Sequence, residues 1–424
     1  LLNCLSFSLS LMNLKRRSKN DWGRLDMRFN LWEDCNRVPL TELLSFIVDN
    51  RGKTVPTAPS GHKLIATNCV TNNTLFPVYE KIRYLSEETY QTWFRAHPIP
   101  GDILFVNKGT PGRVCLVPDP VDFCIAQDMI ALRADESKIY PKYLFAVLRS
   151  REIQQQIYNT NVGDVIPHFK KQFLNQLLIP IPERSIQESI GDLYYVLSLK
   201  AERNKKINDN LYAQAKAIFD NHFINIDAIP AGWRKGNLLD IANYLNGLAM
   251  QKFRPQGNEI GLPVLKIKEL RQGSCDDSSE LCSLRIKPEY IIHDGDVIFS
   301  WSGSLLVDIW CGGTCGLNQH LFKVTSDIYD KWFYYLWTAH HLARFIAIAA
   351  DKATTMGHIK REELAKAEVL IPCEEDYTSL TSIMQPIFEL IISNRIEGRK
   401  LAVLRDELLP KLMSGEIDVS AVQL

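Results

Sequence analysis

The chain repeats itself at a spacing of about 190 residues, and this duplication restricts the possible folds more than any other feature. The segment from Gly163 reads GDVIPHFKKQFLNQLLIPIPE, and the segment from Thr354 reads TTMGHIKREELAKAEVLIPCEE. Aligning the histidines of PHF and GHI gives an offset of 190 residues. Upstream, GDILFVNKG from Gly101 faces GDVIFSWSG from Gly295 at an offset of 194. Solenoid repeats are far shorter, so the sequence predicts a duplicated domain.

Each copy begins with strand-forming runs mixed with turns and helical pieces, and ends in a long polar stretch. The runs at 103–106 and 297–301 are examples of the first part. Such a mixture predicts an α+β globule followed by a helix. The predicted segments are an N-terminal extension at 1–23, a first globule at 24–182, a first spacer helix at 183–223, a second globule at 224–372, and a second spacer helix with a tail at 373–424.

The two polar stretches carry apolar residues at alternating spacings of four and three, the pattern of a coiled coil. Asn204 and Asn394 occupy the same place in the two patterns, and a buried Asn fixes helix register at a cost in stability. We therefore expect the helices to pack antiparallel on each other, although helices packed on their own globules would show the same pattern. Pro386 should kink the second helix or mark its start. The predicted seam residues are Ile186, Ile190, Leu193, Leu197, Ile207, Leu211 and Ile218, then Leu380, Ile383, Ile387, Leu390, Leu401, Leu404 and Leu408.

Helix length gives the predicted spacer a scale. A helix of this size spans about 55 Å, which is about one and a half turns of B-DNA. Two globules held by such a spacer would suit a DNA site whose halves are separated by unread base pairs.

Charge and cysteine content restrict the partners and the compartment. The chain has 49 Lys and Arg against 49 Asp and Glu, a formal net charge of zero. Phosphate neutralisation needs Lys and Arg, so a DNA-binding role requires basic groups segregated on one face or positive charge from partner subunits. The ten cysteines form no CxxC pair, which favours free thiols in a reducing cytoplasm and no metal site.

The N-terminal segment has the charge order opposite to that of a signal peptide. Its apolar residues precede Lys15, Arg16 and Arg17, whereas a signal peptide carries its charge first. We interpret 1–23 as an extension, with Met12 or Met27 as the expected start. The rest of the chain has no apolar run long enough for a membrane span, so we expect a cytoplasmic protein.

Motifs of catalysis are not found. A methyltransferase would need a Gly-rich cofactor loop and an N-P-P-Y-type motif, and the sequence has neither. The RGKT segment from Arg51 resembles the end of a phosphate-binding loop, but that loop requires Gly where Ile47 stands. The sequence predicts a chain that performs no covalent chemistry and holds no cofactor.

Several stretches resemble the specificity subunits of type I restriction–modification systems. They are VDNRGKTVP, GLPVLKIKELRQG, DGDVIFSWSGSLLVDIW, LNQHLFKV, ADKATTMGHIKREELAKAEVLIP and NRIEGRKLAVLRDELLPKLMSGEI. The order globule–helix–globule–helix is a further part of this resemblance. Together these features cover the chain from about residue 24. It implies two target recognition domains that each read half of an asymmetric, bipartite site in double-stranded DNA. It also implies helices that dock two methyltransferase subunits, which use S-adenosylmethionine, and a complex that adds restriction subunits, which use ATP and Mg.

Candidate DNA contacts are polar side chains near the predicted strand ends and loops, since Asn and Gln can pair with adenine, and Arg or Lys with guanine or phosphate. Equivalence of His168 with His358, and of Gln127 with Gln319, favours shared structural roles, because base-reading residues should differ between the domains. Trp301 suits a core aromatic as well as it suits a DNA contact. The candidates are Arg51, Lys53, Asn107, Lys108, Arg113, Lys170 and Lys171 in the first globule, and Lys252, Arg254, Lys266, Lys268, Trp301, Ser302, Ser304, Asn318, Gln319, Lys352, Thr354 and Lys360 in the second.

Two other functions fit parts of the pattern. A structural scaffold would use the same duplicated architecture to bridge protein partners without reading bases. A fused restriction–modification enzyme of another type would need cofactor or nuclease motifs that the sequence lacks.

Overall fold

The computed structural model describes residues 30–50, 52, 54–160, 167–351 and 359–417. The chain divides into two units, and each is described by itself. The first unit comprises Leu1–Asn72, Phe76–Tyr194 and Glu407–Leu424, and the second comprises Asn73–Leu75 and Tyr195–Asp406.

The first unit is built on a four-stranded antiparallel sheet with the order β2-β8-β5-β6. A three-stranded sheet, β4-β3-β7, lies in the same unit, and its β3 and β7 are parallel. A short antiparallel pair, β1-β9, joins the two ends of the globule. The strands are β1 (Arg37–Pro39), β2 (Leu44–Val48), β3 (His62–Ile65), β4 (Arg83–Leu85), β5 (Ile103–Val106), β6 (Val114–Leu116), β7 (Phe123–Ile125), β8 (Met129–Ala134) and β9 (Leu178–Pro180).

Every residue of β5, β6 and β7 is buried, as expected for apolar runs covered on both faces. A helix begins at Pro141, where the fixed φ of proline suits a first helical position. The helices of this unit are α2 (Leu31–Asp34), α3 (Glu87–Thr92), α4 (Pro141–Leu148) and α5 (Arg151–Thr160), with 3-10 turns at Leu40–Leu43, Thr67–Cys69 and Lys171–Gln176.

The second unit has the same sheet plan. Its antiparallel sheet has the order β11-β18-β15-β16, its second sheet has the order β13-β12-β17-β14 with β12 and β17 parallel, and β10-β19 forms the short pair. The strands are β10 (Arg234–Asn237), β11 (Asn243–Asn246), β12 (Leu262–Leu265), β13 (Leu281–Cys282), β14 (Ile291–Ile292), β15 (Val297–Ser300), β16 (Leu306–Ile309), β17 (Cys315–Leu317), β18 (Leu321–Thr325) and β19 (Glu368–Ile371).

The two globules therefore share one topology, strand for strand, with β14 added in the second. This confirms the prediction of an α+β fold with two similar globules, each followed by a long helix. The predicted domain limits, which separate globules from helices, stay predictions.

An aromatic core gathers beneath the helices of the second unit. Trp332, Phe333 and Trp337 of one helix pack around Phe219 and Phe223. The helices of this unit are α7 (Leu238–Ile241), α8 (Ile267–Gln272), α9 (Lys331–His340), α10 (Leu342–Asp351) and α11 (Arg361–Ala365), with 3-10 turns at Met250–Lys252 and Pro288–Tyr290; the long helices are α6 (Arg184–Phe219), extended by a π-helical turn at Asp220–Ile224, and α12 (Glu374–Met413).

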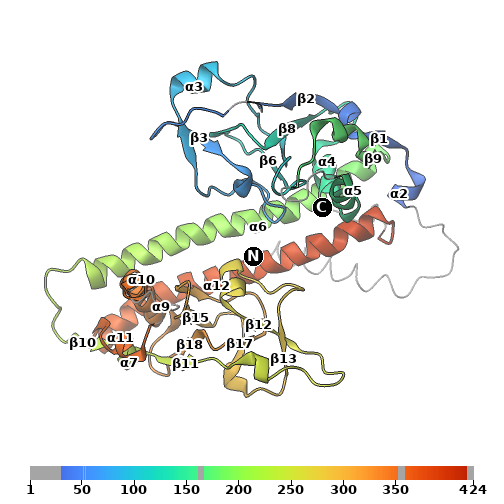
Figure 1. The fold of residues 1–424 in the computed structure, drawn as a ribbon. Coiled ribbons are helices and arrows are strands. Elements are labelled where there is room, and N and C mark those ends of the chain that lie inside the picture. The colour runs from blue at the N-terminus through green and yellow to red at the C-terminus, as the bar shows by residue number, and fades with distance from the viewer. Residues whose placement is uncertain (1–29, 51, 53, 161–166, 352–358, 418–424) are drawn as a thin grey trace. The chain divides into compact units, whose positions relative to one another are not determined.

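Within the second unit, α6 (green) and α12 (red) lie side by side and run in opposite directions (Figure 1). Lys200 Nζ lies 2.5 Å from Glu397 Oε1, whereas Asn208 Nδ2, further along α6, donates to the carbonyl oxygen of Ile391, which lies earlier on α12. The predicted antiparallel pair is confirmed. The second helix begins at Glu374, so Pro386 lies inside it and does not mark its start.

The predicted seam is wrong at three positions. Ile207, Ile383 and Leu390 are each exposed by about half, at 47%, 50% and 46%. Leu380 is buried as predicted, but the next three buried positions of α12, Met384, Phe388 and Ile391, each lie one residue after a predicted position, because this half of the helix faces the second globule as well as α6. On α12 the buried residues are Leu380, Met384, Phe388, Ile391, Arg405, Leu409, Leu412 and Met413.

Within the described ranges, no helix combines the length and the apolar content that a bilayer crossing requires. The same residues contain no cluster of three or more side chains suited to hold a metal ion.

Candidate nucleic-acid interface

In both units, the segment that contains the repeated histidine position returns to the end of a central strand. The Phe169 backbone N–H donates to the Asn107 carbonyl oxygen just after β5, and the Ile359 N–H donates to that of Trp301 just after β15. Lys108 and His168 also form an isolated β-bridge. Phe169 and Ile359, the residues that follow the two aligned histidine positions, thus bond to equivalent strand ends. The second histidine, His358, lies outside the described residues.

The repeated Gly-Asp pair organises the start of the same strands. Asp102 accepts from the Ile99 N–H and forms a two-point ion pair with Arg133, at 2.9 and 3.0 Å. Asp296 likewise accepts from the His293 N–H, and its carboxylate lies 2.8 Å from Lys323 Nζ. These carboxylates hold the sheet together. Neither aspartate is among the residues predicted from the sequence, although their recurrence in GDILF and GDVIF marks them as a pair.

Three predicted DNA contacts are buried and need correction. Asn107 is 0% exposed and its amide donates to the Phe169 carbonyl oxygen. Ser302 is 1% exposed. Asn318 is 4% exposed, and its side-chain oxygen accepts from the His320 N–H. In this structure the three side chains are buried at the strand ends, where they are not accessible to a base edge.

The half-buried Trp301 serves the fold through both parts of its indole. Its Nε1 donates to Asn246 Oδ1 at 3.0 Å, and its ring packs 5.6 Å from that of Phe322. The sequence suited Trp301 both to a core aromatic and to a DNA contact, and the contacts described here are those of a packed aromatic.

A family model described as "Type I restriction modification DNA specificity domain" matches residues 50–213 and 230–402, which cover most of each globule and of each long helix. The chain belongs to this type I restriction–modification specificity family. The two matched segments correspond to the two copies that the internal repeat defines.

Specificity relatives extend the comparison. The chain is 24% identical over 344 residues to the type I restriction enzyme MjaIX specificity subunit of Methanocaldococcus jannaschii, covering 75% of this chain and 78% of the relative. It is 19% identical over 398 residues to the HindI specificity subunit of Haemophilus influenzae, covering 75% of this chain and 86% of the relative.

A solved structure shares the fold. The crystal structure of the type I restriction–modification S subunit from M. genitalium matches with a TM-score of 0.54 at 15% identity, covering 92% of this chain and 98% of that one.

Several predicted contacts of this specificity chain remain available to solvent. Among the described residues, none of the following cations has an ion-pair partner: Lys108, Arg113 and Lys170 in the first unit, and Lys252, Arg254 and Lys360 in the second. Ser304 is exposed and Gln319 is half-buried.

Three other predicted cations already have carboxylate partners. Lys171 lies 3.1 Å from Asp49, Lys266 lies 2.6 Å from Glu280, and Lys268 lies 3.5 Å from Asp276. Their charge is partly neutralised, which weakens them as phosphate contacts. Arg51, Lys53, Lys352 and Thr354 lie outside the described residues.

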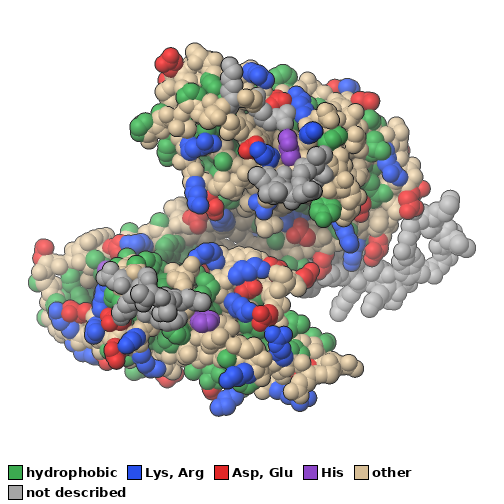
Figure 2. Space-filling model, in the orientation of Figure 1, with side chains coloured by type: hydrophobic (Ala, Val, Ile, Leu, Met, Phe, Trp, Pro, Cys, Tyr) green, Lys and Arg blue, Asp and Glu red, His purple; other side chains and the backbone are tan. Residues whose placement is uncertain are grey.

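On the face that Figure 2 shows, blue Lys and Arg side chains are interspersed with red Asp and Glu side chains in both units. This face does not carry a continuous basic stripe. The visible face therefore does not support a segregation of basic groups on one side. The other option for a neutral DNA-binding chain, positive charge from partner subunits, is not tested by this view.

Proposed function

We propose that this chain is the non-catalytic specificity subunit of a cytoplasmic type I restriction–modification enzyme, and that each globule reads one half of a bipartite, asymmetric site in double-stranded DNA. The observation that carries the proposal is one sheet framework, present twice, with different side chains on equivalent hairpins. The hairpin after β5 presents Lys108 and Arg113, whereas the hairpin after β15 presents Ser304. Cationic and hydroxyl donors select different base edges, so the two half-sites should differ.

Two exposed lysines that have no ion-pair partner among the described residues, Lys170 and Lys360, are the proposed phosphate contacts. Lys170 and Lys360 stand two residues after the repeated histidine position in each copy, beside the strand ends described above. Phosphate contacts set the orientation of a protein on the duplex and carry little sequence information. Because these lysines recur in both copies, we assign them to orientation and assign the differing hairpins to base reading.

Exposed apolar side chains on the long helices support docking of two methyltransferase (modification) subunits, with restriction subunits added to the assembly. A partner subunit that covered these side chains would remove their apolar area from water, which would favour association. S-adenosylmethionine, ATP and Mg would be bound by those partners and not by this chain. Within the second unit the exposed apolar residues of the helices are Val196, Ile207, Ile383, Leu390 and Val403.

A domain exchange tests the proposal. Residues 24–182 are replaced by the corresponding segment of a specificity relative, and the methylated sites of host DNA are mapped by long-read sequencing. One half-site should change while the other half and its base-pair gap stay as in the wild type. The matched control replaces 224–372 and should change only the other half. A change in both halves from either exchange would contradict one globule per half-site. If neither exchange changed the methylated sites, the scaffold function would be favoured.

A further inference from the structure

Two arginines of α12, one helical turn apart, hold carboxylates of the second globule. Arg399 makes a two-point pair with Asp294, with Nη1 to Oδ1 at 2.9 Å and Nη2 to Oδ2 at 2.8 Å. Arg395 Nη1 donates to Asp308 Oδ1 at 2.7 Å and to the Ile309 carbonyl oxygen at 2.8 Å. Residues four apart share a helix face, so the two arginines form one attachment, which we call the arginine clamp.

The clamp grips a part of the globule that is continuous with its core. Asp294 Oδ1 also accepts from the Gly313 N–H at 2.8 Å, and Trp310 Nε1 donates to the Gly313 carbonyl oxygen at 2.6 Å. Trp310 is 1% exposed and packs in the core of the second sheet. Gly313 has a φ of +95°, and a Cβ there would lie 3.0 Å from Arg399 Nη1. The loop is thus shaped to receive the guanidinium.

A second, apolar attachment lies nearer the start of α12. Met384 and Phe388 are buried in the aromatic core, where the Phe388 ring lies 5.6 Å from that of Tyr335. From Phe388 to Arg399 the helix advances about 16 Å at 1.5 Å per residue. Ile392 and Ile396 also pack against the core, so the clamp lies at the end of a continuous attachment, where its directed contacts oppose rotation of the globule about the buried residues.

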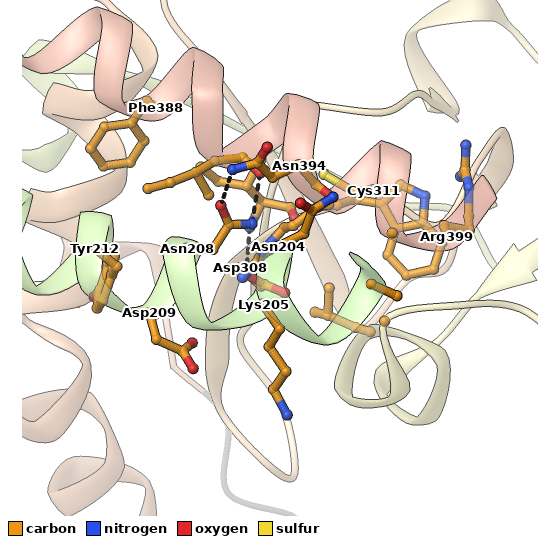
Figure 3. Close-up of a pocket in the computed structure, with 18 of the residues that line it drawn as sticks. Asn204, Lys205, Asn208, Asp209, Tyr212, Asp308, Cys311, Phe388, Asn394 and Arg399 are labelled. Atoms are coloured by element: carbon orange, nitrogen blue, oxygen red, sulfur yellow. Dashed lines mark hydrogen bonds and ion pairs between the residues drawn. The ribbon is translucent and has the colours of Figure 1, made fainter. Parts of the chain in front are cut away.

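Beside the clamp the packing is open. A cavity of about 620 Å³ is lined by Phe388 and Tyr335, by both clamp arginines, and by Asn208 of α6 (Figure 3). Close-packed interiors resist small movements of the elements that pack together. The residues that line this cavity offer less resistance to such movements, because they are not packed against one another across it. Ile392 and Ile396, on either side of Arg395, pack against the core of the globule, and the directed ion pairs add the polar contacts that fix the angle between helix and globule here.

We infer that Arg395 and Arg399 are positioning residues that set the angle of the second recognition domain on the helix pair, and thereby the gap between half-sites that the enzyme accepts. The inference rests on the proposed function. One base pair moves a half-site by about 3.4 Å and rotates it by about 35° around the duplex. A globule held at one angle accepts one gap, whereas a loosened globule accepts neighbouring gaps.

The two arginine–carboxylate pairs contribute more to the orientation of the globule on the helix than to the stability of the fold. The four side chains are between 25% and 38% exposed, so water can still reach a carboxylate whose arginine is removed and limits the loss of folding free energy. Two-point arginine–carboxylate pairs are nonetheless strongly directional. Removing them should leave a folded chain whose geometry is relaxed.

The test uses the complete methyltransferase, this chain with its modification subunits. The substrates are duplexes that carry both native half-sites at the native gap and at gaps one or two base pairs shorter or longer. Arg395→Gln, Arg399→Gln and the double variant are compared with Lys400→Gln, which removes one exposed charge from the neighbouring position. In the double variant, selectivity for the native gap should fall about tenfold, a change of about 1.4 kcal/mol, with the half-site bases unchanged. Lys400→Gln should keep wild-type selectivity.

Each other outcome decides something different. A folded double variant that keeps the wild-type gap preference overturns the inference, and so does relaxed selectivity in Lys400→Gln. If the wild-type enzyme shows no requirement for two half-sites, the proposed function fails instead. Should the double variant not assemble, Arg399→Lys keeps the charge and removes the two-point geometry. It should relax the gap preference partially, and an unchanged preference would overturn the inference.

Discussion

At the scale of single residues, a small amide network determines how the long helices meet. Asn394 Nδ2 donates to Asn208 Oδ1 at 3.0 Å, and Asn204 Nδ2 donates to Glu397 Oε2 at 2.7 Å. The two asparagines singled out by the repeat thus lie at the helix contact, and Asn208 joins them. The sequence pattern did not select Asn208, because it assigned that part of the seam to Ile207.

Asn208→Ala should lower the free energy of unfolding by about 1–3 kcal/mol, because it removes the buried donor to the Ile391 carbonyl oxygen and the acceptor of the part-buried Asn394 amide. The matched control is Asn210→Ala, an exposed position on the same helix, where the change should stay within about 0.5 kcal/mol. Urea unfolding followed by circular dichroism measures both. Equal effects of the two substitutions would show that the network does not stabilise the pair.

A buried histidine predicts a specific pH dependence. His341 Nε2 donates to the Glu368 carbonyl oxygen at 2.8 Å. Burial lowers the pKa of His341 below its ordinary value near 6.5, more than the Glu368 carbonyl raises it. Burial likewise lowers the pKa values of His340 and His97. Between the lowered and ordinary pKa values the unfolded chain binds more protons, so stability falls as pH falls.

The free energy of unfolding should therefore decrease from pH 7 to pH 5. In His341→Gln, which keeps a donor for Glu368 but cannot be protonated, the decrease should be smaller. Thermal unfolding at a series of pH values gives the comparison. An identical slope in the variant would mean that His341 does not contribute to the acid sensitivity.

At the scale of elements, two helical glycines predict opposite effects of one substitution. A Cβ on Gly191 of α6 would lie 2.5 Å from the Tyr143 backbone nitrogen and 2.9 Å from the Lys142 carbonyl carbon, so α6 and α4 approach too closely for a side chain. A Cβ on Gly398 of α12 would meet nothing within 4 Å.

Gly191→Ala should destabilise the protein by about 2 kcal/mol, because the helices must separate. Gly398→Ala should stabilise it by about 0.5–1 kcal/mol, since alanine favours a helix interior. The unfolding midpoints of the two variants should move in opposite directions. Destabilisation by both would contradict the open space at Gly398, and stabilisation by both would contradict the close crossing at Gly191.

At the scale of the whole molecule, the duplication predicted the fold and left the site only partly defined. Paired motifs such as GDILF and GDVIF located equivalent strands, because a duplicated core retains its pattern of burial. Burial of the individual polar residues Ser302 and Asn318 depended on tertiary contacts that their local sequence does not encode. The arginine clamp was equally hidden, since Arg399 and Asp294 lie 105 residues apart and have no counterpart pair in the first copy.

The balance of charge gives the last prediction. The numbers of cationic and anionic residues are equal, so the chain has no net positive charge to favour the release of counterions from DNA. The isolated chain should therefore bind its site weakly, with a Kd on the order of 10⁻⁴–10⁻⁶ M at physiological salt, as for non-specific binding. Modification subunits should add phosphate contacts, and the assembled complex should then bind tightly and with steep salt dependence. Fluorescence anisotropy titrations at three salt concentrations, with a scrambled duplex as control, measure this. Nanomolar, site-specific binding by the chain alone would contradict the argument, because the charge would then have to come from this chain.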